Sequence, residues 1–197
     1  MTKFVVLASR NAKKLTELQA LLEPLSFRLR LVSEFTDEAA EETAPTFVEN
    51  ALLKARHAAK VSGLPAISDD SGIEVDALKG APGVRSARFA GAQADDSANN
   101  AKLLQALAGR PESERGARYV CVLAFLRQSD DPIPVIAEGQ WRGRILAAPR
   151  GENGFGYDPL FYVPTHKQSA AELDPGLKNR LSHRARAAAQ LLAKLRG

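Results

Sequence analysis

The chain has 197 residues, of which 45% are hydrophobic and 25% charged, and its formal net charge is +4. This length and balance favour one globular domain, residues 1–197, or two lobes that share a sheet. The single cysteine, Cys121, excludes an intramolecular disulfide. No stretch approaches the roughly 20 apolar residues of a membrane span, and the N-terminal apolar run is too short for a signal peptide. We therefore expect a cytoplasmic protein with no membrane partner.

The N-terminal segment has the pattern of a strand followed by a helix. Phe4–Ala8 is continuously apolar, which predicts a strand buried on both faces. A polar turn follows, and leucines at helical spacing over residues 15–22 predict a helix that Pro24 ends. A strand that enters a helix through a turn containing Lys13 and Lys14 is a common anion-binding geometry. The alternative is that both lysines are solvated helix surface, and the turn lacks the Walker pattern.

An acidic segment at residues 34–42, which includes Glu41, comes before a predicted capping box at Thr46–Glu49. In a capping box the Thr46 hydroxyl and the Glu49 carboxylate each accept from the other residue's N–H. We therefore interpret Glu49 as a cap rather than a catalyst. The helix that it begins runs to about Val61.

Two adjacent acids, Asp69 and Asp70, stand in the stretch Asp-Asp-Ser-Gly. Apolar residues 64–67 predict a strand before them, and alternating residues 73–76 predict another after them. Adjacent carboxylates repel each other, so the pair needs a cation, a basic partner or full solvation. A solvated turn is one interpretation. The other is a ligand site at the C-terminal end of a strand.

The middle of the chain predicts a loop, a helix and a hairpin. Gly80–Gly83 reads as a loop, and Asp95 or Asp96 can cap a helix that includes residues 103–107. Residues 117–126 and 134 to about 145 predict two long strands. We interpret Asp130-Asp131 between them as the exposed tip of the hairpin.

A second unusual stretch, residues 151–159, combines three glycines with two aromatic residues and Asp158. A plain turn explains the glycines, but it does not explain Phe155, Tyr157 or Asp158. A flat ligand stacked on Phe155, with Asp158 accepting a hydrogen bond from its edge, explains all of them. Residues 160–163 then predict a short strand.

The C-terminal segment is basic, with no Asp or Glu from Lys178 onward. Asp174-Pro175 predicts a helix start that presents Lys178. His183 and Arg184 fall in the first turn of the last helix, where a cation is unfavourable unless an anion or carbonyl-rich ligand lies nearby. A structural hydrogen bond is the alternative role for His183.

Together, these loops supply basic groups for phosphates, oxygen ligands for Mg²⁺ and a surface for a flat ring, which indicates a nucleotide. The motifs also resemble those of the inosine triphosphate pyrophosphatase family along essentially the whole chain. The matching stretches are Ser9-x-Asn11-x-x-Lys14, Glu41-Glu42-Thr43, Thr46-Phe47-x-Glu49-Asn50-Ala51, Asp69-Asp70-Ser71-Gly72, Gly80-Ala81-Pro82-Gly83, Gly154-Phe155-Gly156-Tyr157-Asp158-Pro159 and Ser182-His183-Arg184.

The resemblance implies a role for each matching position. Asp70 would accept the proton of the attacking water, and Glu41 and Asp70 would hold Mg²⁺. The residues that would bind the triphosphate are Ser9, Arg10, Asn11, Ala12, Lys13 and Lys14. Ser71 would contact the substrate, and the residues that would bind and read the base are Phe155, Gly156, Tyr157, Asp158, Lys178, His183 and Arg184. Where the family often has Thr-Gly-Asn, this chain has Ser9-Arg10-Asn11, which places an extra cation near the phosphates.

The resemblance further implies an α/β fold with a long curved mixed sheet and flanking helices, two lobes around a central substrate cleft, and a homodimer. The expected reaction is Mg²⁺-dependent hydrolysis of ITP, dITP and XTP to the monophosphate and pyrophosphate. Hydrogen bonds to the 6-oxo, N1–H edge of the base would reject adenine. An enzyme for modified pyrimidine or methylated nucleotides is one alternative. A basic nucleic-acid-binding module is another, although we expect no stable nucleic-acid partner.

Overall fold

The computed structural model describes residues 3–196, in which seven strands form one mixed sheet in the order β2-β1-β3-β4-β5-β6-β7. The strands are β1 (Lys3–Leu7), β2 (Phe27–Leu31), β3 (Ala66–Val75), β4 (Gly116–Leu126), β5 (Val135–Ile145), β6 (Phe161–Val163) and β7 (Gln168–Ser169). The α-helices are α1 (Ala12–Leu21), α2 (Phe47–Ser62), α3 (Asp96–Ala106), α4 (Pro175–Leu181) and α5 (His183–Arg196). None of these helices combines the length and the apolar character that crossing a membrane requires.

The chain divides into two compact units, which are described separately. The first unit contains the residues up to Asp70, Cys121–Gly139 and the residues from His183 onward. The second unit contains Ser71–Val120 and Gln140–Ser182. The strands β3, β4 and β5 each contribute residues to both units.

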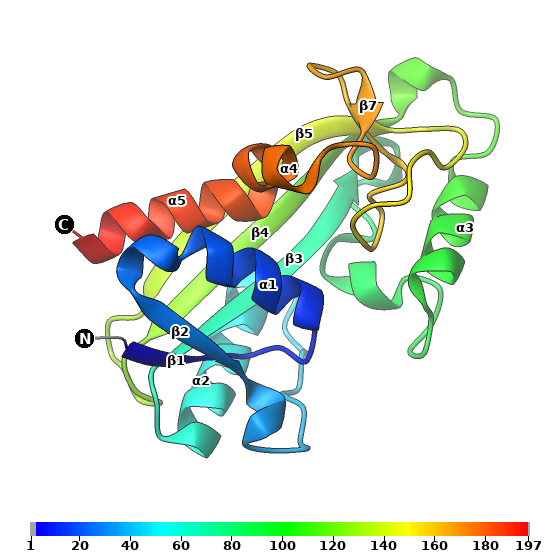
Figure 1. Ribbon diagram of the computed structural model, residues 1–197. Coiled ribbons are helices and arrows are strands. Elements are labelled where there is room, and N and C mark those ends of the chain that lie inside the picture. The colour runs from blue at the N-terminus through cyan, green and yellow to red at the C-terminus, as the bar shows by residue number, and fades with distance from the viewer. Residues whose placement is uncertain (1–2, 197) are drawn as a thin grey trace. The chain divides into compact units, whose positions relative to one another are not determined.

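The first unit buries apolar side chains on both faces of its part of the sheet. β1 pairs in parallel with β2 and with β3. On one face, Leu18 of α1 and Leu191 of α5 belong to the same buried cluster as Leu7. On the other face, alanines of α2 pack against β4 through Ala55 and Val122. Figure 1 shows α1 and α5 on one side of these strands and α2 on the other.

Gly139 of β5 allows α5 to begin close to the sheet. A Cβ at this position would collide with the carbonyl oxygen of His183 and with the backbone nitrogen of Ala187. The first turn of α5 can therefore lie directly on β5, and this fixes where Arg184 enters the unit.

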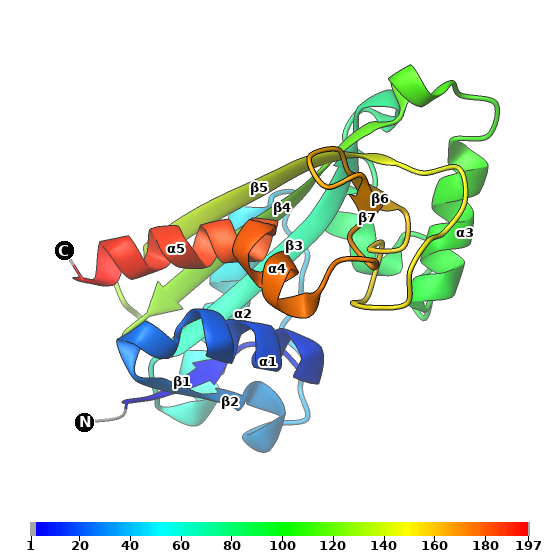
Figure 2. The same ribbon diagram turned by 45° about the horizontal axis from the view of Figure 1, so that its top comes forward.

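The second unit has an aromatic core. Tyr119, Trp141 and Phe161 pack with ring centroids 4.6–6.4 Å apart, and Leu103 and Leu107 from the α3 region join the same cluster. In Figure 2 the loop that follows β5 approaches α3, which brings residues distant in sequence together within this unit.

Most predicted elements are confirmed, including the mixed sheet with flanking helices, the two long strands β4 and β5, and the helix that Thr46 caps. The predicted curvature, lobes, cleft and single-domain organisation stay predictions. In the capping box the Glu49 carboxylate lies against the Thr46 hydroxyl, and Thr46 Oγ1 accepts from the Glu49 N–H. β7 was not predicted, because a two-residue strand has too few positions to show a pattern.

Two predictions are wrong. The stretch at 69–72 is not a turn between two strands, because β3 continues unbroken from Ala66 to Val75 and carries both acids in its middle. The pair therefore does not stand at the end of its own strand, although β1 makes its last pairing with β3 at Leu7↔Ile67, just before the acids. Asp131 is not exposed at a hairpin tip, because its side chain is 2% exposed and forms an ion pair with Arg127.

Candidate active site

The two acids of β3 lie on opposite faces of the strand, since successive side chains of a strand point to opposite sides. Asp69 reaches Lys14 and Arg184, which come from α1 and α5. Asp70 reaches Lys54, which comes from α2. The helices on the two faces of the first unit therefore each supply the cation that one acid needs. These cations let the strand continue through two adjacent carboxylates.

Asp69 is a fully buried anion held by two cations. Its Oδ1 lies 2.7 Å from Lys14 Nζ, and its Oδ2 lies 2.5 Å from Arg184 Nε. Burial by itself would raise the pKa of Asp69, but the charges of Arg184 and Lys14 outweigh it and hold the pKa well below its usual range. Asp69 is therefore a permanent negative charge that organises its neighbours and is unsuited to accepting a proton.

Arg184, the cation in the first turn of α5, pairs with acids of the protein itself. The guanidinium of Arg184 contacts Asp69 with one side and Glu17 of α1 with the other, at 2.6 Å, and its side chain is 2% exposed. This explains why arginine is tolerated at this end of a helix. Direct contact of Arg184 with a base stays a prediction, and the observed ion pairs favour a role in holding Asp69 and Glu17.

Asp70 has a different environment. Its Oδ1 forms an ion pair with Lys54. The Lys54 ammonium also lies 3.3 Å from Glu42 Oε1 and donates a hydrogen bond to the Asp69 carbonyl oxygen at 3.0 Å. Burial raises the pKa of Asp70, and the nearby Glu42 adds to this effect against the opposing charge of Lys54. A buried carboxylate with a raised pKa is better suited to accepting a proton than Asp69 is.

The oxygen-rich surroundings of Asp70 fit a hard divalent cation. Within residues 3–196, no cluster of three or more His, Cys, Asp or Glu side chains could by itself hold a metal ion. Mg²⁺ commonly takes only one or two protein carboxylates and completes its coordination with water and substrate phosphates. Carboxylate and carbonyl oxygens already converge on the Lys54 ammonium, so this corner of the protein is built to surround a cation.

Sequence reasoning assigned the metal to Glu41 and Asp70, and the structure adds Glu42 and Lys54. Glu41 is exposed and forms no ion pair with residues 3–196, whereas Glu42 is already paired with Lys54. The metal role of Glu41 stays a prediction. Lys54 lies on α2 and is no part of the motifs that the sequence singles out. The helical spacing from Ala51 to Lys54 could have placed its side chain on the buried side.

Side chains of the turn before α1 already bond its own backbone N–H groups, which the sequence did not indicate. The Asn11 side chain accepts hydrogen bonds from the backbone nitrogens of Lys13 and Lys14, at 2.9 and 3.2 Å. Ser9 Oγ accepts from the backbone nitrogen of Asn11 at 3.1 Å. Most first-turn N–H groups are thus already bonded, so side chains such as Lys14 are the main positive groups that this turn offers an anion.

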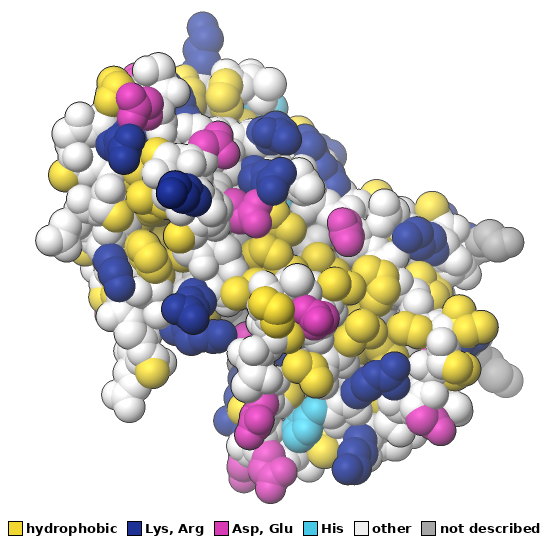
Figure 3. All heavy atoms as spheres, turned by 180° about the vertical axis from the view of Figure 1, so that it is seen from behind, with side chains coloured by type: hydrophobic (Ala, Val, Ile, Leu, Met, Phe, Trp, Pro, Cys, Tyr) yellow, Lys and Arg dark blue, Asp and Glu magenta, His cyan; other side chains and the backbone are white. Residues whose placement is uncertain are grey.

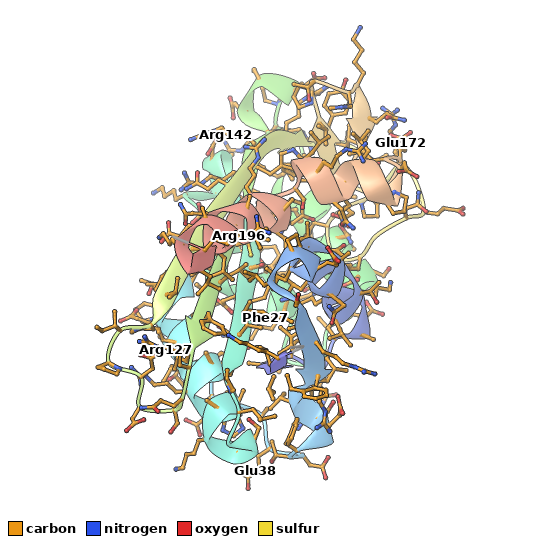
Figure 4. The ribbon with its side chains drawn as sticks, turned by 60° about the vertical axis from the view of Figure 1, so that its left-hand side comes forward. Phe27, Glu38, Arg127, Arg142, Glu172 and Arg196 are labelled. Atoms are coloured by element: carbon orange, nitrogen blue, oxygen red, sulfur yellow. The ribbon has the colours of Figure 1, made fainter. Side chains whose placement is uncertain are left out.

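A pocket of about 250 Å³ lies beside this turn and contains charges of both signs. Its charged lining residues are Arg10, Lys14, Glu38, Glu42, Lys54 and Asp69, together with His57. Figure 3 shows acidic side chains next to a histidine on one face of the molecule, and Figure 4 shows Glu38 at the edge of the first unit near α2. Cations and carboxylates are paired along its lining, as Lys14 is with Asp69 and Lys54 is with Glu42, and such a mixture of charges is compatible with an anion that carries a metal ion.

Arg10 contacts the acidic segment. Its guanidinium donates to the carbonyl oxygen of Asp37, and the His57 Nε2 lies 3.3 Å from the carbonyl oxygen of Glu38. These two contacts hold the segment at residues 37–38 against the turn before α1 and against α2. The predicted contact of Arg10 with phosphates stays a prediction.

The second unit holds a separate group of predicted residues around Asp158. The carboxylate of Asp158 accepts from Lys178 Nζ at 2.7 Å, the Tyr119 hydroxyl at 3.2 Å and the backbone nitrogen of Phe155 at 2.9 Å. The Lys178 ammonium also lies 5.0 Å from the centre of the Phe155 ring. Phe155, Asp158 and Lys178 are therefore brought together, as the sequence predicted for a base-binding group.

Glycine is required at position 154 of this loop, because a Cβ there would collide with the Asp158 carboxylate. Tyr157 points inward: its side chain is buried and its hydroxyl donates to the Ser86 carbonyl oxygen at 2.8 Å. Burial and the nearby charge of Asp96 raise the pKa of this hydroxyl. Tyr157 thus anchors the loop, and its contact with a ligand stays a prediction.

The remaining predicted residues are divided between the units. Ser71 is half-buried and directly follows Asp70, whereas His183 is buried at the start of α5. The phosphate and metal candidates, with His183 and Arg184, belong to the first unit, and the residues around Asp158 belong to the second. Their contacts with a ligand stay predictions.

Comparisons with known proteins agree with this fold. The Ham1 family model matches residues 5–194. A dITP/XTP pyrophosphatase of Pseudomonas syringae pv. tomato is 59% identical over 191 residues, 97% of this chain and 96% of that protein. The dITP/XTP pyrophosphatase of Pseudomonas aeruginosa is 58% identical over the same shares.

Among solved structures, a HAM1 protein from Coxiella burnetii matches with a TM-score of 0.90 and 50% identity, over 98% of each chain. The Ham1 protein of Staphylococcus aureus matches with a TM-score of 0.86 and 40% identity, over 99% of each chain. Fold and site define a mixed α/β protein with a buried, cation-bound acid pair in the middle of its sheet. The chain belongs to the Ham1 family. The resemblance found in the sequence is therefore confirmed.

Proposed function

We propose that this protein is a Mg²⁺-dependent pyrophosphatase for non-standard purine nucleoside triphosphates, namely ITP, dITP and XTP. The names of its relatives support this activity. The observation that carries the proposal is Asp70, a buried carboxylate with a raised pKa, surrounded by Lys54 and Glu42. Such a group can take the proton of a water molecule while nearby cations hold a phosphate.

In the proposed reaction, Asp70 accepts a proton from water as the water oxygen bonds to the α-phosphorus. The bond from the α-phosphorus to the bridging oxygen breaks, and pyrophosphate leaves from the nucleoside monophosphate. Lys14 and Lys54 stabilise the charge that builds up on the phosphate oxygens. Mg²⁺, held by Asp70 and Glu41, would supply further charge neutralisation when bound. The structural role of Glu42 is then to hold Lys54 in position.

The group around Asp158 is proposed to hold the base. Phe155 offers a ring face for stacking, and the Lys178 ammonium can donate to a 6-oxo oxygen but not to a 6-amino group. A base with a 6-amino group would leave such a donor unsatisfied, which is a strong basis for rejection. Removal of non-standard purines from the nucleotide pool, a cytoplasmic location and a homodimer belong to the same proposal and rest on the family resemblance.

The alternatives receive less support from the structure. A nucleic-acid-binding helix needs exposed cations, but Arg184 of α5 is buried and paired with Asp69. A specificity for modified pyrimidines is distinguished from the proposal by experiment.

The test is pyrophosphate release with Mg²⁺ from ITP, XTP, ATP, GTP and modified pyrimidine nucleotides. We expect ITP and XTP to be the best substrates by a factor of roughly 10² or more in kcat/KM, the scale on which unpaired polar groups reject a substrate. Equal rates with ATP, or a preference for modified pyrimidines, would disprove the proposed specificity.

The metal assignment has its own test in the adjacent pair Glu41 and Glu42. We expect Glu41→Gln to raise the Mg²⁺ concentration needed for half-maximal rate, because it removes a charged metal ligand. Glu42→Gln should instead lower the rate at saturating Mg²⁺, since it loosens Lys54. The opposite pattern in a Mg²⁺ titration would show that Glu42, and not Glu41, is the metal ligand.

A further inference from the structure

Helix α3 grips one residue of the aromatic glycine loop at both of its backbone polar groups. The carboxylate of Asp96 accepts from the Gly156 nitrogen at 2.7 Å. The Asn100 side-chain amide donates to the Gly156 carbonyl oxygen at 2.8 Å and to the Asp96 carbonyl oxygen at 2.7 Å. Asp96 and Asn100 are four residues apart, so they lie on the same face of the helix. All three residues belong to the second unit.

These contacts are not needed to form α3. Asp95 is the N-cap, and its side chain accepts from the Ala98 nitrogen at 2.7 Å. Asn99, next to Asn100, bonds a different segment: it donates to the Ala87 carbonyl oxygen and accepts from the Ala90 nitrogen. The buried core of the helix is supplied by Leu103. Asp96 is exposed except for its contact with the loop.

Among the described residues, the side-chain amide of Asn100 forms hydrogen bonds through its nitrogen only, which indicates a positioning role. Its two donated hydrogen bonds leave from the nitrogen, whereas its oxygen is buried without a hydrogen-bond partner among residues 3–196. An unsatisfied buried oxygen costs stability. The side chain is therefore poorly explained by stability alone, and the bond from its nitrogen to Gly156 explains it.

The loop needs such external support because its own backbone is unusual. Gly154 and Gly156 have φ values of +78° and +64°, in the left-handed region. Between them, Phe155 is held by the bond from its nitrogen to the Asp158 carboxylate. Gly156 directly follows Phe155, whose ring centre lies 5.0 Å from Lys178 Nζ, so we expect a change in the Gly156 backbone to shift this ring.

We propose that Asp96 and Asn100 are positioning residues that fix the Gly156 peptide and thereby set the affinity and selectivity for the base. This inference rests on the proposed function of the loop. The triphosphate candidates belong to the first unit. We therefore expect a substitution of Asp96 or Asn100 to weaken binding of the base and to leave binding of the phosphates unchanged. The two residues act through the loop and do not touch the reacting atoms.

The main variants are Asp96→Ala and Asn100→Ala. Each removes one hydrogen bond to Gly156, so we expect KM for ITP and XTP to rise by roughly 3- to 10-fold with little change in kcat. The ratio of kcat/KM between ITP and ATP should fall. Inhibition by inorganic tripolyphosphate, which has no base, should be unchanged.

Two further variants separate positioning from stability. Asp96→Asn keeps a side-chain oxygen that can accept from the Gly156 nitrogen, so it should recover most of the wild-type KM. Asp95→Ala is the matched control: it removes the N-cap of the same helix and lowers its stability, but it should leave KM and the ITP/ATP ratio unchanged. An equal rise in KM for Asp95→Ala and Asp96→Ala would overturn the proposal.

Amide hydrogen exchange of the peptide that contains Gly156 gives a readout independent of activity. Exchange should be faster in Asp96→Ala than in the wild type, whatever the substrate. If exchange and KM are both unchanged in the folded variant, the positioning role is wrong. If exchange is faster but the wild type hydrolyses neither ITP nor XTP, the contact stands and the proposed function is wrong.

Discussion

Asp69-Asp70 and Asp130-Asp131 are the same dipeptide in two kinds of backbone. The first lies in the middle of β3, where Asp69 pairs with cations from α1 and α5 and Asp70 pairs with a cation from α2. The second lies in the connection between β4 and β5, where Asp131 pairs with Arg127 only four residues before it. Figure 4 shows Arg127 beside this connection. The difference is the origin of the partners: those of Asp69 lie 55 and 115 residues away.

The partners of Asp69-Asp70 come from segments distant in sequence, and this pair joins those segments in the candidate site. The partner of Asp131 is a near neighbour in sequence, and this pair stabilises only its own connection. Asp70 keeps a raised pKa in a buried, mixed-charge environment. Asp131 has its pKa lowered by hydrogen bonds from Arg127, both side chain and backbone. Residue type alone therefore does not decide the role of an acid. Four substitutions, one in each acid, test this difference.

The largest effect on stability is expected for Asp69→Asn. The amide cannot neutralise Arg184 and Lys14. Arg184 keeps its pair with Glu17 but loses the fully buried one, and breaking a buried ion pair by removing one partner costs about 3–5 kcal/mol. Chemical unfolding monitored through Trp141 measures the loss. Lys14→Met is the matched control, because it removes the more exposed cation, with 19% of its side chain accessible, and leaves the pair with Arg184. A free energy of unfolding equal to the wild type would show that Asp69 does not organise this region.

Asp70→Asn should affect the rate more than the stability. It removes the proposed proton acceptor, which lowers kcat by roughly 10²-fold or more, while Lys54 keeps Glu42 and the Asp69 carbonyl as partners. Pyrophosphate release from ITP at saturating Mg²⁺ measures the effect. A near-normal rate under this condition would remove Asp70 from the catalytic role.

Sequence patterns predicted the elements well because each depends on neighbouring residues. Apolar runs predicted β1 and β4, the hairpin pattern predicted β5, and Thr46 and Asp174 predicted the starts of α2 and α4. The continuity of β3 could not be predicted, because two acids inside a strand need cations that the sequence does not pair with them. The resemblance gave a catalytic and a metal role to Asp70 and none to Asp69. The physical difference between the two acids, opposite faces of one strand, appears only once the strand is continuous.

The candidate site was predicted residue by residue, but its internal partners were not. Lys54 and Glu42 meet Asp70 only after α2 packs on the sheet. Similarly, Asp95 and Asp96 were equivalent as helix caps in the sequence. The structure separates them, since Asp95 caps α3 and Asp96 bonds Gly156, 60 residues away.

Asp131→Asn tests the local pair and is expected to have a moderate effect. The carboxylate of Asp131 accepts from the Arg127 guanidinium, the Arg127 nitrogen and the Ile133 nitrogen. Losing this charge should lower Tm by roughly 2–4 °C, the scale of one such contact in a chain of this size, without changing kcat. Because the pKa of Asp131 is lower folded than unfolded, its contribution is present above the unfolded value and is lost as pH falls below about 4.

Melting curves at pH 7 and pH 3 check the sign of this pH dependence. The wild type should lose more stability on acidification than Asp131→Asn, since the variant has no carboxylate to protonate at this position. A Tm difference between the two proteins that is equal at both pH values would contradict the assigned pair with Arg127.

Asp130→Asn should have the smallest effect, with kcat, KM and Tm all close to the wild type. The Asp130 side chain is exposed and forms no ion pair with residues 3–196, and surface substitutions of this kind usually change stability little. It is the natural control for Asp70→Asn, because both remove one negative charge from an Asp-Asp pair. If Asp130→Asn lowered pyrophosphate release as much as Asp70→Asn, net charge rather than the environment of Asp70 would account for the loss of activity.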